Sequence, residues 1–190
     1  MMLRKVLLVA VLSSVSAFVN AAECTSNLNA QAPITVVGTY SNMRYTTEHV
    51  YGFTVGLWRS RDCYFGLFLS SSGLMSDTPI GLIENMKYDQ KTGAISFFSR
   101  LTMGSVSPTP SKNEWVPSKD VYEFIGTLKN NLLSGVVSHK ILNLQATHPE
   151  PENVVLKLSS DDLSYIPDDL TYSQWELTAK DILKFRGPEW

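Results

Sequence analysis

Bulky and small residues alternate along two neighbouring stretches of the chain, His49–Trp58 and Cys63–Leu69. Four polar residues, Arg59–Asp62, interrupt the alternation between them. A period of two places every second side chain on the same face of a β-strand. The bulky residues that share one face of the first stretch are Tyr51, Phe53, Val55 and Leu57. The pattern therefore predicts a β-hairpin that turns at Arg59–Asp62.

Six more stretches have the composition of β-strands, with aromatic and β-branched residues that suit a half-buried pleated surface. They are Ile34–Tyr40, Ile80–Tyr88, Ala94–Leu101, Asp120–Lys129, Leu132–Leu142 and Asn153–Leu158. Tight turns are predicted at Asp89–Gly93 and Asn130–Asn131, because glycine and asparagine tolerate left-handed backbone.

The C-terminal tail changes from a period of two to a helical period. Ser173–Glu176 matches a capping box, in which the first and last side chains satisfy backbone N–H groups at a helix start. One helical stripe carries Trp175, Ala179, Ile182 and Leu183. Gly187 and Pro188 are natural stop signals. An amphipathic α-helix is predicted over 174–186.

The links between the eight predicted strands alternate in length. The long links are Asn42–Glu48, Ser70–Pro79, Met103–Lys119 and Asn143–Glu152. Consecutive links of an up-and-down sheet lie at opposite ends, so all long loops gather at one end. Eight antiparallel strands that curl and close form a barrel without exposed edges. The predicted fold is all-β: a single eight-stranded antiparallel up-and-down barrel with a C-terminal α-helix.

The first 22 residues have the anatomy of a cleaved secretory signal peptide. A basic start at Met1–Lys5 precedes an apolar run, Val6–Val19, and small residues at Asn20–Ala22. The run is short for a membrane span, although a retained anchor is the alternative. Cleavage leaves 190 − 22 = 168 residues, so 23–190 is expected to form one domain exported to the periplasm or the extracellular space.

The mature chain carries a mild negative charge. Loss of Arg4 and Lys5 with the signal gives (16 − 2) − 18 = −4, counting histidine as neutral. A chain of this charge without clusters of basic residues offers nucleic acid no binding surface. No second long apolar run occurs in the sequence, so no membrane span is expected in the mature chain.

Two cysteines, Cys24 and Cys63, remain after cleavage. In an oxidising compartment a lone pair of cysteines is most simply a disulfide. Two free thiols or a metal site are the alternatives. Cys63 follows a tight turn, and the first strand starts at the same end of the barrel, with Cys24 about ten residues before it. The pairing therefore agrees with the predicted strand order.

An eight-stranded meander barrel with a disulfide, an export signal and a late helix resembles the lipocalin and avidin group of barrels. Gly38-Thr39-Tyr40 resembles the glycine-x-tryptophan motif of that group's first strand, with tyrosine in place of tryptophan. The similarity covers three residues and extends to no second motif. It implies a ligand cavity that opens at one end of the barrel.

No catalytic, metal-binding or cofactor-binding motif is present in the sequence. His49, His139 and His148 are not spaced as metal ligands on one strand or one helical turn. The acidic pairs Asp161–Asp162 and Asp168–Asp169 precede the helix, where solvated capping carboxylates are common. An enzyme built from scattered residues stays the third alternative, and no catalytic, metal or cofactor residue is predicted.

Polar and aromatic residues gather at the predicted long-loop end. The residues expected to line this mouth are Arg44, Tyr45, His49, Tyr51, Trp115 and His148. Such amphipathic side chains suit contact with a small molecule or a partner surface. Solvated histidines and a Trp115 packed on a neighbouring loop are the structural alternative. Gly52, Gly56 and Gly66 are expected to make room for a packed neighbour, such as the C-terminal helix through Trp175, or for a ligand inside the barrel.

Two functions from different classes follow. The first is an exported, non-enzymatic barrel that binds a small apolar ligand at its long-loop mouth. The second is a protein-interaction module, such as an inhibitor of an extracellular or periplasmic hydrolase, that inserts the Pro-rich Met103–Lys119 loop into its partner.

Overall fold

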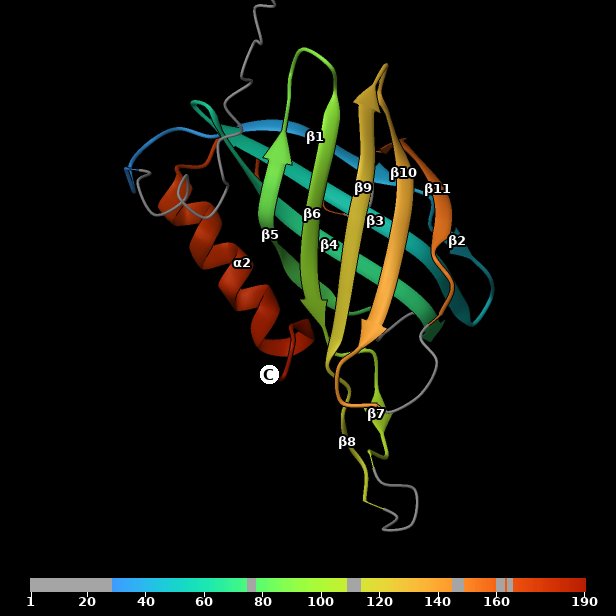
Figure 1. The fold of residues 1–190 in the computed structure, drawn as a ribbon. Helices are drawn as coiled ribbons and strands as arrows, with labels where there is room; N and C mark the ends of the chain where they lie inside the picture. The colour runs from blue at the N-terminus through green and yellow to red at the C-terminus, as the bar shows by residue number, and fades with distance from the viewer. Residues whose placement is uncertain (1–28, 75–77, 109–113, 145–148, 160–162, 164–165) are drawn as a thin grey trace, which may run out of the picture.

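The computed structural model describes residues 29–74, 78–108, 114–144, 149–159, 163 and 166–190. Within these residues, eight long antiparallel strands close into a barrel, because β1 pairs with both β3 and β11. The barrel strands are β1 (Thr35–Ser41), β3 (His49–Ser60), β4 (Cys63–Leu74), β5 (Ile80–Tyr88), β6 (Ala94–Leu101), β9 (Asp120–Lys129), β10 (Leu132–Ile141) and β11 (Glu152–Ser159). They follow one another around the barrel in chain order (Figure 1), so the predicted fold class is confirmed.

Three short strands lie inside the predicted loops. β2 (Arg44–Tyr45) pairs with the first residues of β3. β7 (Ser105–Val106) and β8 (Val116–Pro117) pair with each other and form a hairpin that extends beyond the end of the barrel (Figure 1). The prediction that both segments are loops throughout is therefore wrong at these residues. A strand of two residues has no measurable period, so only its pairing partner reveals it.

β4 extends beyond Cys63–Leu69, the apolar stretch that predicted it. The serine-rich start of the predicted flexible link, Ser70–Pro79, continues the strand as far as Leu74. Ser70 pairs with Phe53 and Ser72 with Tyr51, so the backbone hydrogen bonds of β3 hold this segment extended. The prediction of a flexible link from Ser70 was therefore wrong for its first five residues.

Aromatic side chains fill the described interior of the barrel. Phe68 lies at the centre, with its ring centroid 5.8 Å from Phe53, 6.0 Å from Phe97 and 5.4 Å from Tyr122. Phe97 in turn stacks on Phe124 at 5.2 Å. All five side chains are buried. Ring pairs at these distances add to the hydrophobic effect of burial.

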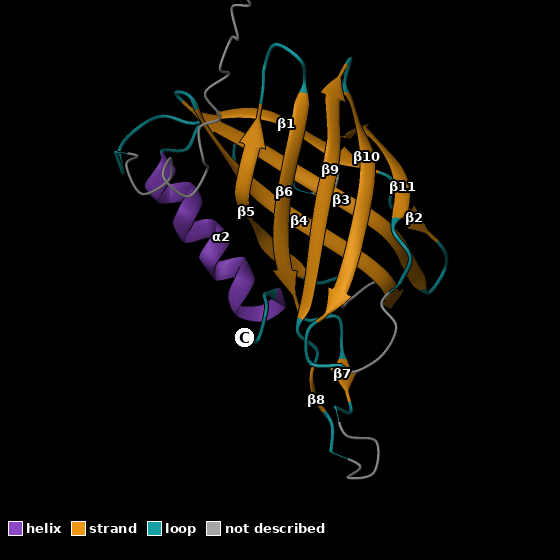
Figure 2. Cartoon of the chain, in the orientation of Figure 1, coloured by secondary structure: helices purple, strands orange, loops and turns teal. Residues whose placement is uncertain are grey.

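The helix α2 (Tyr172–Arg186) packs on the outside of the barrel (Figure 2). Its Trp175 ring lies 4.5 Å from Phe65 and 5.5 Å from Trp58, and Ala179 is buried beside it. The helix was predicted correctly, but its cap was not. Thr171 and Gln174 form the capping box, two residues before the predicted Ser173.

Two of the strand glycines have a packing role. A Cβ atom on Gly56 would collide with the side chains of Leu163 and Trp58, and one on Gly66 would collide with the Gly56 carbonyl. Both residues therefore let neighbouring groups approach the sheet closely. Gly52 differs, because its φ of 121° lies in the region that favours glycine.

The chain order of antiparallel strands places every long link at one end of the barrel. This end is the long-loop end, and the tight turns lie at the other. Thr35, at the start of β1, pairs with Arg59 beside the β3–β4 turn, so β1 begins at the tight-turn end near Cys63. Cys24 and residues 1–22 lie outside the described residues, so the disulfide and the signal peptide stay predictions.

Candidate functional site

Four of the predicted mouth residues lie together at the long-loop end. Arg44 pairs with Tyr51, Tyr45 pairs with Val50, and the His49 ring stacks on Tyr51 with centroids 6.0 Å apart. The Tyr45 and Tyr51 side chains are exposed. The pairing of β2 with β3 thus gathers these residues into one aromatic rim.

The other two predicted mouth residues are not part of this rim as described. Trp115 directly precedes β8 on the protruding hairpin, where its side chain is 65% exposed. His148 lies outside the described residues. The structure therefore brings together Arg44, Tyr45, His49 and Tyr51, and it places Trp115 on a separate element.

A polar network inside the same end of the barrel was missed by the sequence analysis. Asp120 accepts a hydrogen bond from the Ser118 hydroxyl and one of 3.0 Å from the Met103 backbone N–H. His139 Nε2 lies 2.6 Å from the other Asp120 oxygen. The Asp120 side chain is 1% exposed, so these bonds replace its hydration.

His139 is held in one orientation by contacts on two sides. Its ring stacks on Tyr122 with centroids 4.2 Å apart and an angle of 7° between the planes. The side chain is 19% exposed, so one part of the ring reaches the solvent. We call Ser118, Asp120, Tyr122 and His139 the mouth network. It presents a fixed, partly exposed imidazole at the long-loop end.

The mouth network lies directly above the aromatic filling of the barrel. Tyr122 contacts Phe53 and Phe68 below it, with ring centroids 6.2 Å and 5.4 Å away, and His139 on its other side. The filling therefore ends in a stacked pair of rings, Tyr122 and His139, near the solvent. The apolar interior becomes polar within this one layer.

The environment shifts the pKa values of two groups in the network. Burial by itself raises the pKa of Asp120, but the hydrogen bonds from His139, Ser118 and Met103 outweigh it and hold the pKa below its ordinary value. Burial raises the pKa of Tyr122 to about 12. A hydrogen bond from Ser70 opposes this rise, and the charge of Asp120 adds to it. Asp120 is thus charged and Tyr122 neutral at pH 7.

The hydrogen-bond order argues against a hydrolase triad. In such a triad the serine bonds to the histidine, and the aspartate bonds to the other ring nitrogen. Here Ser118 bonds to Asp120, and Asp120 bonds to His139. The Ser118 hydroxyl therefore donates to a carboxylate and not to the imidazole, and the pattern is suited to fixing the histidine ring rather than to the serine–histidine proton transfer of a triad.

The network was missed because its members come from different parts of the chain. The register of β9 and β10 places Asp120 opposite Ile141 and Tyr122 opposite His139. The members of the network become neighbours only through this pairing. One signal was available. Asp120 and Tyr122 share the alternating face of Phe124, so a carboxylate was placed on an inward-facing position of a predicted strand.

The part of the chain that the structure describes has neither a cluster of metal-ligating side chains nor a helix suited to span a membrane. No group of three or more histidine, cysteine, aspartate or glutamate side chains in that part of the chain is arranged to hold a metal ion. None of the helices described there has the length and apolar character needed to cross a bilayer.

Burial of Tyr122 predicts a loss of stability at alkaline pH. A raised pKa means that its contribution is fully present below the ordinary value of 10.0 and is lost as the pH rises through about 12. About 2 to 3 kcal/mol of unfolding free energy is expected to disappear across this interval. Urea unfolding at a pH below 10 and at a pH near 12 measures this loss of unfolding free energy. Tyr122→Phe cannot ionise and is expected to lack this part of the loss; an identical pH profile would contradict the assignment.

The closed eight-stranded barrel is compatible with the architecture of lipocalins and avidins. Comparison with known proteins adds no closer relation: no family model, no curated protein sequence and no solved structure matches this chain.

Proposed function

We propose that this protein is an exported, non-enzymatic barrel that holds a small ligand at its long-loop end. The observation that carries the proposal is the stacked Tyr122–His139 pair, which ends the aromatic filling and leaves His139 partly exposed. Ligand sites combine aromatic side chains with a few fixed polar groups, and this pair supplies one of each.

The ligand is expected to be mainly apolar and to carry one hydrogen-bonding group. The rings below favour an apolar body, and the partly exposed His139 imidazole favours a polar group that reaches the network from the solvent side. Phe53, Phe68 and Tyr122 occupy the interior below the network, so the ligand is placed above these rings rather than among them.

The rim of β2 and β3 supplies side chains that suit contact with the exposed part of the ligand. Arg44 offers a charge, and Tyr51 stacked on His49 offers a second aromatic surface. A polar edge around an apolar floor fixes the orientation of a bound molecule. This arrangement retains the predicted mouth residues Arg44, Tyr45, His49 and Tyr51 as part of the proposed site.

Native mass spectrometry of the protein purified from its own host tests the proposal. The expected species has the mass of residues 23–190 less two hydrogens for a Cys24–Cys63 disulfide, together with a small non-covalent ligand. His139→Gln retains a donor for Asp120 but removes the stacked ring, and it is expected to lower the ligand-bound fraction at least tenfold. Lys129→Ala, at the far end of the neighbouring strand, serves as the control.

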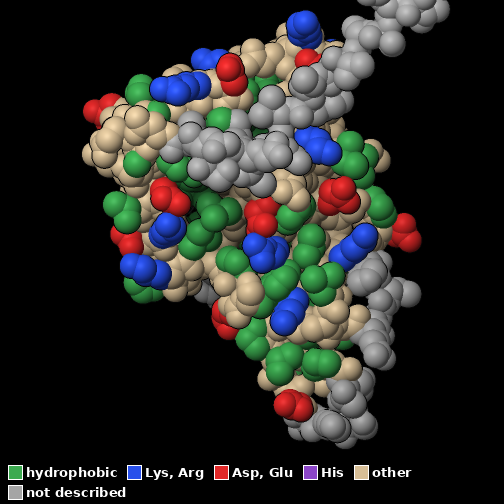
Figure 3. Space-filling model, turned by 60° about the vertical axis from the view of Figure 1, so that its left-hand side comes forward, with side chains coloured by type: hydrophobic (Ala, Val, Ile, Leu, Met, Phe, Trp, Pro, Cys, Tyr) green, Lys and Arg blue, Asp and Glu red, His purple; other side chains and the backbone are tan. Residues whose placement is uncertain are grey.

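A protein-interaction module is the second candidate, and the protruding β7–β8 hairpin favours it. The hairpin lies clear of the barrel (Figures 1 and 3), and an exposed tryptophan such as Trp115 is a common anchor of interfaces. The same purification distinguishes the two functions. A co-purifying protein that is lost in Trp115→Ala, with no small ligand present, would replace the first proposal with the second.

A further inference from the structure

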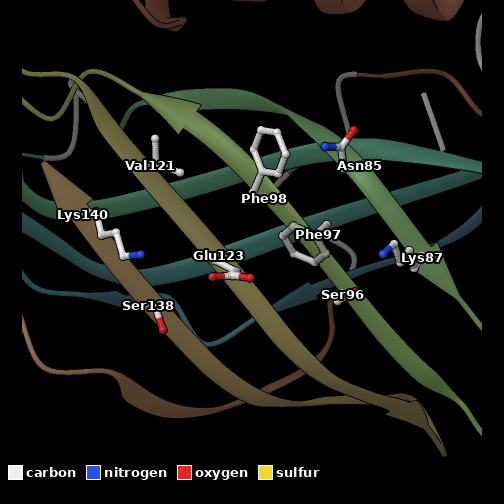
Figure 4. Close-up of a pocket in the computed structure, with 9 residues that line it drawn as sticks. All are labelled: Asn85, Lys87, Ser96, Phe97, Phe98, Val121, Glu123, Ser138 and Lys140. Carbon is white, nitrogen blue, oxygen red and sulfur yellow. The ribbon is translucent and has the colours of Figure 1, made fainter. Parts of the chain in front are cut away.

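A groove of about 460 Å³ lies on the outer face of the barrel, across β5, β6, β9 and β10 (Figure 4). Its lining residues are Asn85, Lys87, Ser96, Phe97, Phe98, Val121, Glu123, Ser138 and Lys140. The volume falls in the range of small-molecule sites, roughly 300 to 1,000 Å³. It is separate from the mouth network, which faces the interior of the barrel.

Strand register gathers the groove residues from distant parts of the chain. Glu123 of β9 stands opposite both Phe98 of β6 and Ser138 of β10. Lys140 lies opposite Val121, one step nearer the long-loop end, and Lys87 lies opposite Ser96 on the other side. In Figure 4 Glu123 occupies the centre, between the two lysines.

Three charged side chains of the groove form no ion pair with one another among the described residues. Lys87, Glu123 and Lys140 are exposed, and among the described residues no ion pair within 4.0 Å involves any of them. The nearby Arg100 is already bound, with its Nε 2.7 Å from Glu84 Oε1 and its guanidinium over the Trp190 ring. Asn85 at the edge of the groove has φ 48° and lies within the register shift between Glu84 and Lys87 of β5.

Donors and acceptors are therefore interleaved around one aromatic ring. The lysine amines donate, Glu123 accepts, and the Asn85 amide and the Ser96 and Ser138 hydroxyls do both. A ligand that fits must present many groups able to donate and accept at once. It must also present an apolar patch to the half-buried Phe98, whose ring stands beside the groove in Figure 4.

We propose that this groove binds an oligosaccharide. Sugar hydroxyls both donate and accept hydrogen bonds, and the C–H face of a sugar ring is an apolar surface that packs on an aromatic ring. A mainly apolar ligand would leave the two amines and the carboxylate without partners. A polyanion would meet Glu123 at the centre of the groove. The shallow, open shape also suits a chain that continues on both sides.

Titration calorimetry of the full mature chain with four hexasaccharides tests the proposal: chitohexaose, cellohexaose, maltohexaose and hexagalacturonate. At least one is expected to bind. Glu123→Gln keeps the size of the side chain at an exposed position and is expected to weaken this binding at least tenfold. Phe98→Ala is expected to abolish it, with thermal unfolding used to verify that the variant folds.

Ile125→Ala provides the matched control, because Ile125 is the next outward residue of β9 and lies outside the groove. The affinity of Ile125→Ala for the sugar is expected to equal that of the unmodified protein. Absence of binding by all four sugars at millimolar concentration would overturn the proposal. Binding of hexagalacturonate alone, unchanged in Phe98→Ala and lost in a Lys87→Gln, Lys140→Gln variant, would also overturn it in favour of simple anion capture.

Discussion

Phe68→Ala is expected to lower the free energy of unfolding by about 4 kcal/mol, the largest effect of any change considered for this barrel. Phe68 is 1% exposed, and its ring contacts Phe53, Phe97 and Tyr122. Alanine removes the transfer free energy of the ring and leaves a cavity whose walls are strands of a closed barrel. Such walls cannot collapse easily, because each strand is hydrogen-bonded on both sides.

Equilibrium unfolding in urea measures the change, and Phe185→Ala is the matched control. Phe185 lies on α2 with its side chain 88% exposed, so its removal is expected to alter stability by less than about 0.5 kcal/mol. If the two variants lose similar stability, Phe68 does not occupy the centre of a packed interior. The interior around Phe68 would then be loosely packed, with room for a ligand deep in the barrel.

Asp120→Ala is expected to lower the free energy of unfolding by about 3 kcal/mol. The carboxylate accepts hydrogen bonds from Ser118, the Met103 backbone and His139 in a buried setting. Alanine leaves the Ser118 hydroxyl and His139 Nε2 without this acceptor, and the Met103 N–H keeps only the Ser118 hydroxyl oxygen, 3.0 Å away. The midpoint of urea unfolding at neutral pH gives the change.

An exposed aspartate in a similar pair provides the control for Asp120. Asp181 accepts a hydrogen bond of 2.7 Å from Lys184, but both side chains are about 70% exposed. Solvated ion pairs contribute about 0 to 1 kcal/mol, so Asp181→Ala is expected to have a small effect. Comparable losses in the two variants would show that burial does not strengthen the Asp120 bonds.

The pH dependence of the Asp120 effect has a definite sign. Its pKa is lowered on folding, so its stabilising contribution is present above the ordinary value of 3.8 and is lost as the pH falls through the lower value in the folded protein. The difference in stability between the unmodified protein and Asp120→Asn is therefore expected to be largest at neutral pH and to narrow in acid. A difference that widens below the ordinary pKa would contradict the assignment.

Part of the candidate site was accessible from the sequence, and part was not. Counting long and short links placed Arg44, Tyr45, His49 and Tyr51 at one end of the barrel, and the structure puts them side by side. Asp120 escaped notice because an acidic residue at the start of a predicted strand resembles the end of a loop. Its partner His139 lies on the neighbouring strand, and only their shared inward face reveals the pair.

The sequence by itself determined the eight strands, their turns and the terminal helix, because alternation, turn chemistry and helical stripes are properties of neighbouring residues. Tertiary structure alone decided the extension of β4, the short strands β2, β7 and β8, and the choice of Phe65 as a partner ring of Trp175. It also assembled the mouth network and the outer groove from several strands. These features depend on register between segments far apart in the chain, which is set by closure of the barrel and by no local pattern.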